Sequence, residues 1–218
     1  MKELFNRHKK TLIIATILCL LPILFGVALW DRLPDPMPTH FSVDGTPDGW
    51  SSKTFAVFGL PLFLAAIEWF CVLASSADPR RKNLSPKVLT ITLYIVPIIA
   101  LVTNAAVYAA ALGVDFNIAP VMSTLVGVMF IVIGNYLPKC RQTYTMGIKL
   151  PWTLANEENW NKTHRMAGPL WMIGGALQIV LSFFPGAFAF YGMMIVLAVI
   201  VIVPTVYSIL LAKKQGQI

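Results

Sequence analysis

The sequence predicts an all-α integral membrane protein with six transmembrane helices and both termini in the cytoplasm. The 218 residues are 57% hydrophobic and 12% charged, whereas soluble domains average about 25% charged residues. Six apolar runs of about 20 residues are long enough to cross a bilayer as helices. All but two of the 17 Lys and Arg residues, Arg32 and Lys53, lie in alternate connecting segments. The positive-inside rule assigns those segments to the cytoplasm.

The six apolar runs define the predicted spans, which cover residues 11–30, 54–76, 88–112, 118–137, 167–184 and 189–211. Short connections after the third and fifth spans predict antiparallel helix pairs. Prolines inside spans are tolerated in a bilayer and kink the helix. We therefore expect a single membrane domain over residues 1–218. Its first part is the two-span segment 11–76, and its second is a four-span core, 88–211.

The net charge of +7 does not predict direct nucleic-acid binding, because the positive excess lies in the predicted cytoplasmic segments. Anionic lipid on that side of the membrane accounts for such a distribution, so membrane lipids are the expected contacts. The three cysteines fit no disulfide or metal-binding pattern. We predict no cofactor, and no convincing catalytic constellation is present, so an enzyme is not expected.

The predicted outer loop, residues 31–53, has the composition of an ordered segment. Alternating prolines at 34–38 favour an extended, polyproline-like strip, and the Asp-Gly pairs at 44–45 and 48–49 favour turns. The candidate binding residues of this loop are His40, Asp44 and Asp48. An imidazole with two carboxylates could also bind a divalent metal, although the spacing matches no established motif. The structural alternative is a histidine packed under the loop and aspartates that cap turns.

The predicted cytoplasmic loop, residues 138–166, is irregular or extended over 143–154 and then forms a short helix at the membrane interface. Asn156 is a suitable N-cap, and Gly168-Pro169 is expected to end this helix and begin the next span. The loop either closes the floor of the bundle or binds a partner through Trp, Tyr and Arg, which dominate interface hot spots. The candidate binding or signalling residues are Asn135, Tyr136, Arg141, Gly147, Lys149, Pro151, Trp152, Thr153, Trp160, His164 and Arg165.

Three polar residues, Glu68, Asn104 and Gln178, lie inside predicted spans. A carboxylate in the membrane is costly and requires a partner, unless burial keeps it neutral. The reachable cationic partners of Glu68 are Lys139, Arg141, His164 and Arg165. Hydrogen bonds between helices are the common use of intramembrane amides. A proton or substrate path through Glu68 is the functional alternative.

Two segments resemble the SdpI family of bacterial membrane proteins. Residues 33–50 resemble the small domain of unknown function that commonly precedes the family's core, and residues 134–168 resemble the core signature. The matching positions are Gly134-Asn135, Gly147-Ile148, Pro151-Trp152-Thr153-Leu154, Trp160, Thr163-His164-Arg165 and Gly168. The departures are Thr143, Lys149-Leu150 and Ala155, where the family is expected to have other residues. The four-span core is thus expected to be SdpI-like.

This resemblance implies an immunity protein in the bacterial cytoplasmic membrane. The family's namesake protects against a secreted, membrane-active killing peptide and also holds a transcriptional repressor at the membrane. The expected partners are therefore an extracytoplasmic antimicrobial peptide and a cytoplasmic transcriptional repressor. The alternative from another class is a small transporter or lipid-handling membrane enzyme that uses Glu68 and the outer His and Asp residues. A third alternative is a purely structural membrane protein.

Overall fold

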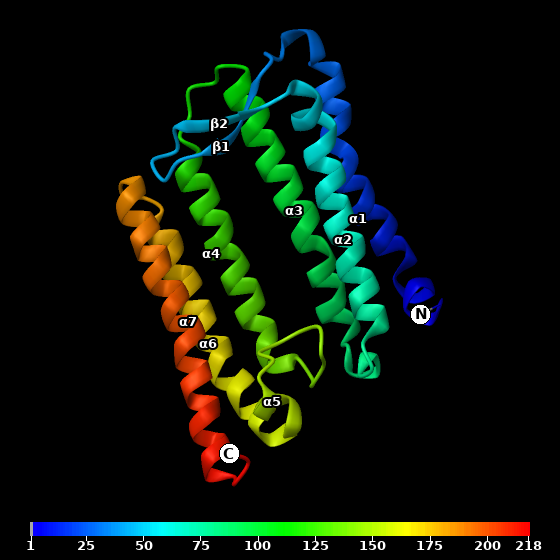
Figure 1. Cartoon of the computed structure of the whole chain (residues 1–218), viewed down its shortest axis with the longest axis vertical. Coiled ribbons are helices and arrows are strands. Elements are labelled where there is room, and N and C mark those ends of the chain that lie inside the picture. The colour runs from blue at the N-terminus through cyan, green and yellow to red at the C-terminus, as the bar shows by residue number, and fades with distance from the viewer. Residues whose placement is uncertain (1) are drawn as a thin grey trace. The chain divides into compact units, whose positions relative to one another are not determined.

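The computed structural model describes residues 2–218, with side chains from residue 8 onward. The helices are α1 (Lys2–Ala28), α2 (Leu60–Ala77), α3 (Pro86–Ala111), α4 (Ile118–Tyr136), α5 (Pro151–Ala155), α6 (Glu157–Leu181) and α7 (Gly186–Lys214), and the strands are β1 (Met37–Phe41) and β2 (Pro47–Ser51) (Figure 1). A π-helical stretch, Phe55–Gly59, leads into α2. The predicted all-α membrane class is confirmed, with a small hairpin added.

Five helices in the described part of the chain are long and apolar enough to span a membrane: His8–Ala28, Phe55–Ala77, Pro86–Ala111, Ile118–Lys139 and Gly186–Lys214. These agree with five of the six predicted spans. The remaining span, predicted at 167–184, lies in α6 and does not qualify. The first turns of α6 are charged, and its apolar part after residue 166 is shorter than the roughly 20 residues that a span requires.

The prediction of a short interfacial helix ending at Gly168-Pro169 is wrong, because α6 continues through Pro169 to Leu181. Its start is correct, since the Asn156 side chain accepts a hydrogen bond from the Asn159 N–H. Proline inside a helix removes one backbone hydrogen bond and does not always end the helix.

The stretch 143–154, predicted as irregular or extended, contains α5 at its end. Pro151 occupies the first helical position, where a missing N–H costs nothing and the fixed φ suits the helix.

The chain forms two compact units. The first comprises residues up to Ser76 together with Thr90–Met122, and the second comprises Ala77–Leu89 and Ser123–Ile218. In the first unit, α1, α2 and α3 contribute Cys19, Ala65 and Ala100 to one buried cluster. A second buried cluster lies under the hairpin and contains Leu33, Met37, Ala56, Val57, Val107 and Tyr108.

The predicted outer loop, 31–53, forms an antiparallel hairpin in which Met37 pairs with Ser51 and Phe41 with Pro47. The turn predicted at Asp44-Gly45 is confirmed, since Gly45 has a φ of +87°. The turn predicted at Asp48-Gly49 is wrong, because Gly49 lies in β2 opposite His40. A Cβ on Gly45 would clash with Asn117 Oδ1, so the hairpin tip packs against the α3–α4 connection.

In the second unit, α4 and α6 approach closely through glycines. A Cβ on Gly134 would lie 2.7 Å from the Gly168 carbonyl oxygen, and one on Gly127 would lie 2.8 Å from that of Gly175. Small residues at helix contacts are typical of membrane bundles, because they allow backbones to meet. The Trp171 indole N–H of α6 donates to the Ile200 carbonyl of α7 at 3.0 Å. This packing positions both ends of the loop 138–166.

Candidate functional site

Two polar segments carry most of the predicted site residues. We call residues 31–53 the hairpin loop and residues 138–166 the cap loop. The hairpin loop belongs to the first unit and the cap loop to the second.

His164 lies at the centre of the cap loop and is 1% exposed. The Ile148 backbone N–H donates to His164 Nε2 at 2.8 Å, and His164 Nδ1 faces the Trp160 carbonyl oxygen at 2.7 Å. An amide N–H only donates and a carbonyl oxygen only accepts, so the ring is neutral with its proton on Nδ1. Burial lowers the pKa of His164 to about 4. This histidine is a structural acceptor in the neutral state.

Trp160 and Gly147 complete this centre. The Trp160 ring stacks on His164 with a centroid separation of 4.1 Å, and its indole N–H donates to the Cys140 carbonyl at 2.8 Å. Gly147 has a φ of +107°, and a Cβ there would lie 2.6 Å from His164 Nε2. Only glycine has both the conformation and the space for this position. Three predicted site residues therefore meet here: Gly147 from the irregular segment, and Trp160 and His164, which lie one turn apart in α6.

Thr153 joins α5 to the same loop and is fully buried. Its hydroxyl donates to the Ile148 carbonyl at 2.8 Å and accepts from the Leu150 N–H at 2.9 Å. The Gln142 side-chain amide donates to the Thr153 carbonyl at 2.7 Å. The first helical turn after Pro151 is thereby tied to both ends of the irregular segment that precedes it.

The cap loop is also attached to α7. The Trp152 indole N–H donates to Ser208 Oγ at 2.8 Å, and the Asn159 side-chain amide donates to the Ser208 carbonyl at 3.0 Å. The Thr163 hydroxyl donates to Asn159 Oδ1 at 3.1 Å. Asn159, Thr163 and Ser208 are fully buried. Buried polar groups with all these partners make the loop a fixed structure.

Asp78, between α2 and α3, is a polar anchor that the sequence did not reveal. It is 2% exposed, and its Oδ2 accepts from the Tyr144 N–H, the Thr145 N–H and the Thr145 hydroxyl at 2.8 to 2.9 Å. Its Oδ1 accepts from the Arg80 N–H at 2.7 Å. The only sequence signal is an aspartate directly after a span, and nothing in the pattern connects it with residues 66 positions later.

The remaining predicted residues of this unit lie on its surface. Exposed side chains are those of Asn135, Arg141, Lys149, Pro151 and Arg165. Tyr136 is half-buried, and the Lys139 ammonium lies 4.6 Å from the centre of its ring. The predicted set therefore divides into buried residues that shape the loop and exposed, mainly basic residues that surround it.

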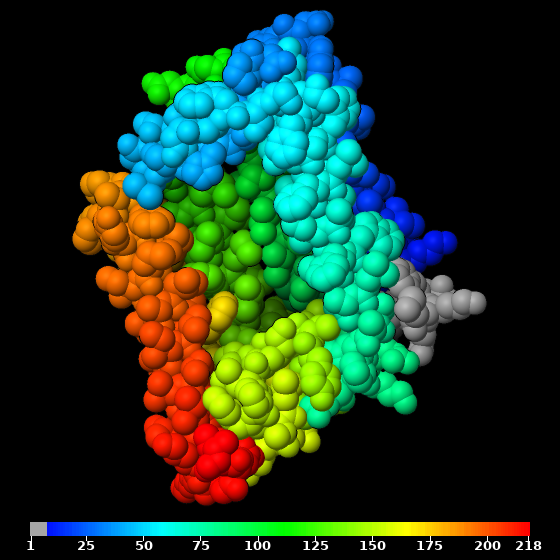
Figure 2. Space-filling view, viewed as in Figure 1, coloured from blue at the N-terminus to red at the C-terminus, as the bar shows by residue number. Residues whose placement is uncertain are grey.

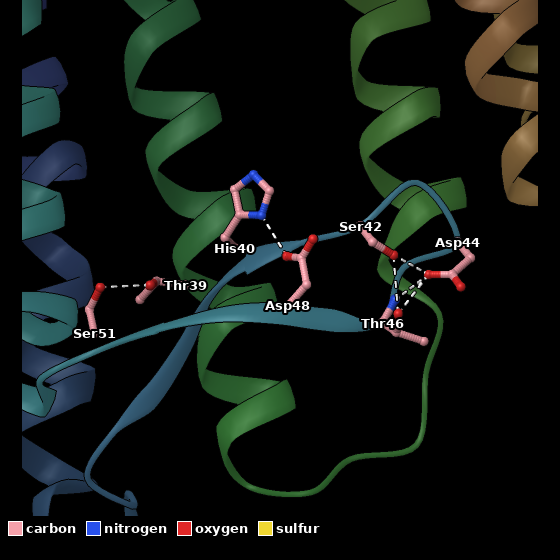
Figure 3. A network of polar contacts seen from close by, with 7 residues as sticks. All are labelled: Thr39, His40, Ser42, Asp44, Thr46, Asp48 and Ser51. Carbon is pink, nitrogen blue, oxygen red and sulfur yellow. Dashed lines mark hydrogen bonds and ion pairs between the residues drawn. The ribbon is translucent and has the colours of Figure 1, made fainter.

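In the hairpin loop, His40 and Asp48 meet across the two strands (Figure 3). His40 Nδ1 lies 2.5 Å from Asp48 Oδ1, and the two side chains are 75% and 44% exposed. The alternative of a histidine packed under the loop is therefore wrong. Figure 2 shows the blue residues of this loop at the surface of the face drawn. The pair is available to a ligand.

Asp44 does not join this pair. Its Oδ1 accepts from the Ser42 hydroxyl, the Thr46 N–H and the Thr46 hydroxyl. These hydrogen bonds, that from Ser42 first, lower the pKa of Asp44 to about 2. Asp44 is thus the turn-capping residue of the structural alternative. Among the described residues, no group of three or more His, Cys, Asp or Glu side chains could hold a metal ion.

Glu68 is 2% exposed, and the partner that the structure gives it is the Cys19 thiol, which donates to Oε2 at 3.3 Å. The prediction of a cationic partner is wrong, because α1 places a thiol beside this carboxyl group. Within the described residues, Glu68 Oε1 has no hydrogen-bond partner. The Gln178 amide donates to Ser123 Oγ of α4 at 2.6 Å, as predicted for a bond between helices. Asn104 donates to the Ala100 carbonyl of its own helix.

Comparison with known proteins agrees with the two resemblances in the sequence. Residues 139–208 match the SdpI/YfhL protein family, and residues 17–65 match a domain of unknown function, DUF1648. Over 210 residues the chain is 28% identical to the immunity protein SdpI of Bacillus subtilis (strain 168), covering 94% of this chain and 97% of that protein. No solved structure matches the chain. With five helices long and apolar enough to span a membrane, the chain is therefore a multi-pass bacterial membrane protein similar to the SdpI family.

Proposed function

We propose that this protein is a membrane immunity protein that protects a bacterium against a secreted, membrane-active antimicrobial peptide. The observation that carries the proposal is the similarity to the immunity protein SdpI, which extends over nearly the full length of both chains. The similarity includes both the hairpin loop and the cap loop. The proposal includes no catalytic step and no cofactor.

The proposed topology has six spans with both termini in the cytoplasm. The distribution of Lys and Arg supports it, and the apolar part of α6 would form the sixth span beside α7. We keep a single domain over 1–218, in which 11–76 precedes the SdpI-like core 88–211. This topology places the hairpin loop outside the cell and the cap loop in the cytoplasm.

The hairpin loop is the proposed binding site for the peptide. His40 and Asp48 expose hydrogen-bonding atoms at the same place, and Trp50 in β2 is 57% exposed. An exposed tryptophan beside polar groups is typical of a binding hot spot. The packed residues beneath the strands keep these side chains in place. Asp44 would act indirectly, through the shape of the turn.

The cap loop is the proposed signalling surface. Its exposed cations Arg141, Lys149 and Arg165 surround a fixed core, and this combination supports recognition of a cytoplasmic partner such as a transcriptional repressor. Anionic lipid headgroups would contact the same cations in the absence of the partner. A peptide bound outside changes this surface only if it binds one conformation of the protein more tightly than another.

A second candidate function is transport of a proton or small solute. One observation favours it: Glu68 is buried among helices and has an oxygen without a described partner. Flux across vesicles containing the purified protein, lost in Glu68→Gln, would support transport. Full protection by Glu68→Gln would exclude a role for Glu68 in immunity.

The proposed function is tested by survival of a sensitive bacterium that expresses this chain and is challenged with a killing peptide of the type that SdpI family members neutralise. His40→Ala, Trp152→Ala and His164→Ala are compared at matched membrane abundance. Protection by the wild type supports immunity, and its loss in the variants identifies the loop that contributes. A wild type that gives no protection against such peptides contradicts the assignment.

A further inference from the structure

We propose that Asp78 is the positioning residue of the cap loop: its buried carboxylate holds residues 144–145 and thereby fixes the surface that the loop presents. The consequence for signalling rests on the proposed function, because only there does the cap loop have a partner. The positioning itself does not rest on it and is tested separately.

The Asp78 carboxylate accepts four hydrogen bonds. Both Asp78 oxygens are used, and three of the four donors are backbone N–H groups, of Arg80, Tyr144 and Thr145. The described ion pairs do not include Asp78. A buried carboxylate without a cation is stabilised by such donors alone. These donors therefore require a side chain with two acceptor oxygens at position 78. A positively charged side chain there could not accept their hydrogen bonds.

Neighbouring residues reinforce the same connection. Arg80 Nη1 donates to the Leu154 carbonyl at 3.2 Å, and its guanidinium lies 5.0 Å from the centre of the Tyr144 ring. The Asn83 amide donates to the Gln142 carbonyl at 2.8 Å. The linker after α2 thus contacts the cap loop at residues 142, 144–145 and 154. Asp78 differs from the other two because its side chain is fully buried and accepts from the loop backbone.

Asp78 lies between the helix that follows the hairpin loop and the residues that it bonds in the cap loop. Asp78 directly follows Ala77, the last residue of α2, and α2 follows the hairpin loop with only the π-helical stretch between. The residue at the end of this helix is therefore bonded to the loop that contains Gly147, three positions after Tyr144. Gly147 in turn contacts His164 and Trp160. Asp78 therefore holds the part of the cap loop that leads directly to its buried centre.

A native thiol reports on the position of the loop. Cys140 is half-buried, its thiol faces the Tyr136 carbonyl, and burial raises the pKa of this thiol to about 11. A thiol reacts as the thiolate, so Cys140 should be labelled slowly while the loop is closed. Cys19→Ser, which keeps a donor to Glu68, and Cys71→Ser leave Cys140 as the reporting cysteine.

The experiment measures the rate of maleimide labelling of Cys140 in the purified, full-length protein in lipid nanodiscs. Asp78→Asn and Asp78→Ala are compared with Asp115→Asn, an exposed aspartate of the α3–α4 connection. An amide cannot accept hydrogen bonds at both of its ends, so the Asp78→Asn variant holds the loop less firmly than the wild type. We expect labelling to accelerate about tenfold in both Asp78 variants, because local opening follows lost hydrogen bonds, and to be unchanged in Asp115→Asn.

Circular dichroism shows whether each variant retains its helix content. If Asp78→Ala does not fold, Asp78→Asn and Thr145→Ala, which removes one of the four bonds, provide the graded comparison. An unchanged labelling rate in folded Asp78→Asn overturns the proposal. Faster labelling with full protection in cells leaves the positioning role intact and removes its link to immunity. If the wild type does not protect cells, the proposed function fails, but the labelling rates still decide whether Asp78 positions the cap loop.

Discussion

The hairpin loop and the cap loop are both long polar segments, but they hold their polar side chains in opposite ways. In the hairpin loop, His40, Asp48 and Asp44 bond to other groups of the same short segment and stay exposed. In the cap loop, Thr153 and His164 are buried and bond to backbone atoms. An exposed pair can exchange its partner for a ligand at little cost, whereas a buried donor or acceptor cannot. The hairpin loop is thus built for contact and the interior of the cap loop for shape.

The largest effect that tests this difference is expected for Gly147→Ala. The new Cβ would lie 2.6 Å from His164 Nε2 and 2.7 Å from the Trp160 ring, at a φ of +107°. Backbone strain and overpacking together should lower the free energy of unfolding by about 3 kcal/mol or more. The control is Gly113→Ala, where φ is +74° and nothing lies within 4 Å, so only about 1 kcal/mol is expected.

Thermal unfolding in mild detergent measures both glycine variants. Equal losses in Gly147→Ala and Gly113→Ala would show that the contacts of Gly147 do not matter. The cap loop would then be less tightly packed than its contacts indicate, and the comparison of the two loops would fail.

The second effect is a loss of stability in acid that depends on His164. Its pKa is about 4 in the folded protein and 6.5 in the unfolded chain, so between these values the unfolded chain binds more protons. Stability is therefore complete above about pH 6.5 and falls as the pH drops toward 4, by on the order of 3 kcal/mol. A protonated ring would also lose the bond from the Ile148 N–H, because Nε2 could no longer accept.

The measurement is the unfolding temperature of the wild type and of His164→Gln between about pH 4.5 and about pH 7.5. The variant should be less stable at neutral pH and should show a smaller slope, since carboxylates contribute equally to both proteins. Parallel slopes would mean that His164 titrates normally and is not buried as a neutral acceptor.

The third effect concerns Thr153. Thr153→Val keeps the shape but leaves the Leu150 N–H without its acceptor, at a cost of about 2 kcal/mol. Thr153→Ser keeps the hydroxyl and loses one methyl group, so about 1 kcal/mol is expected. Chemical unfolding separates the two variants. If serine were as harmful as valine, packing of the methyl group rather than hydrogen bonding would hold α5.

The same contrast explains what the sequence could predict. Apolar length alone identifies five membrane helices, and turn chemistry identifies Asp44-Gly45. A hairpin centred on that pair places His40 opposite Gly49, next to Asp48, so their meeting could have been predicted from an Asp-Gly turn. The alternating prolines at 34–38 favour a polyproline-like strip instead, so no strand is predicted there. The resemblance to the SdpI family, predicted from two short segments, is likewise found in the family comparison.

The interior of the cap loop could not be predicted in this way. Helical spacing brings Trp160 and His164 together, but nothing in the sequence brings Gly147 to them. Asp78 pairs with residues more than 60 positions later, and no local pattern encodes such a contact. The continuation of α6 through Pro169 depends on packing between helices, because Gly168 lies directly against Gly134. Propensity rules cannot include such packing.

The smallest effect on stability, and the most informative for function, is expected for His40→Ala. An exposed pair of polar side chains contributes about 0–1 kcal/mol even when both are charged, so the unfolding temperature should hardly change. Protection of sensitive cells should nevertheless be lost, because the variant removes one of the two exposed polar groups at the proposed peptide site. Asp44→Asn is the control, since its amide oxygen can still accept from Thr46 and keep the turn. Loss of protection in His40→Ala together with a large loss of stability would show that His40 has a structural role, like the buried residues of the cap loop. The proposed difference between an exposed binding loop and a buried structural loop would then be wrong.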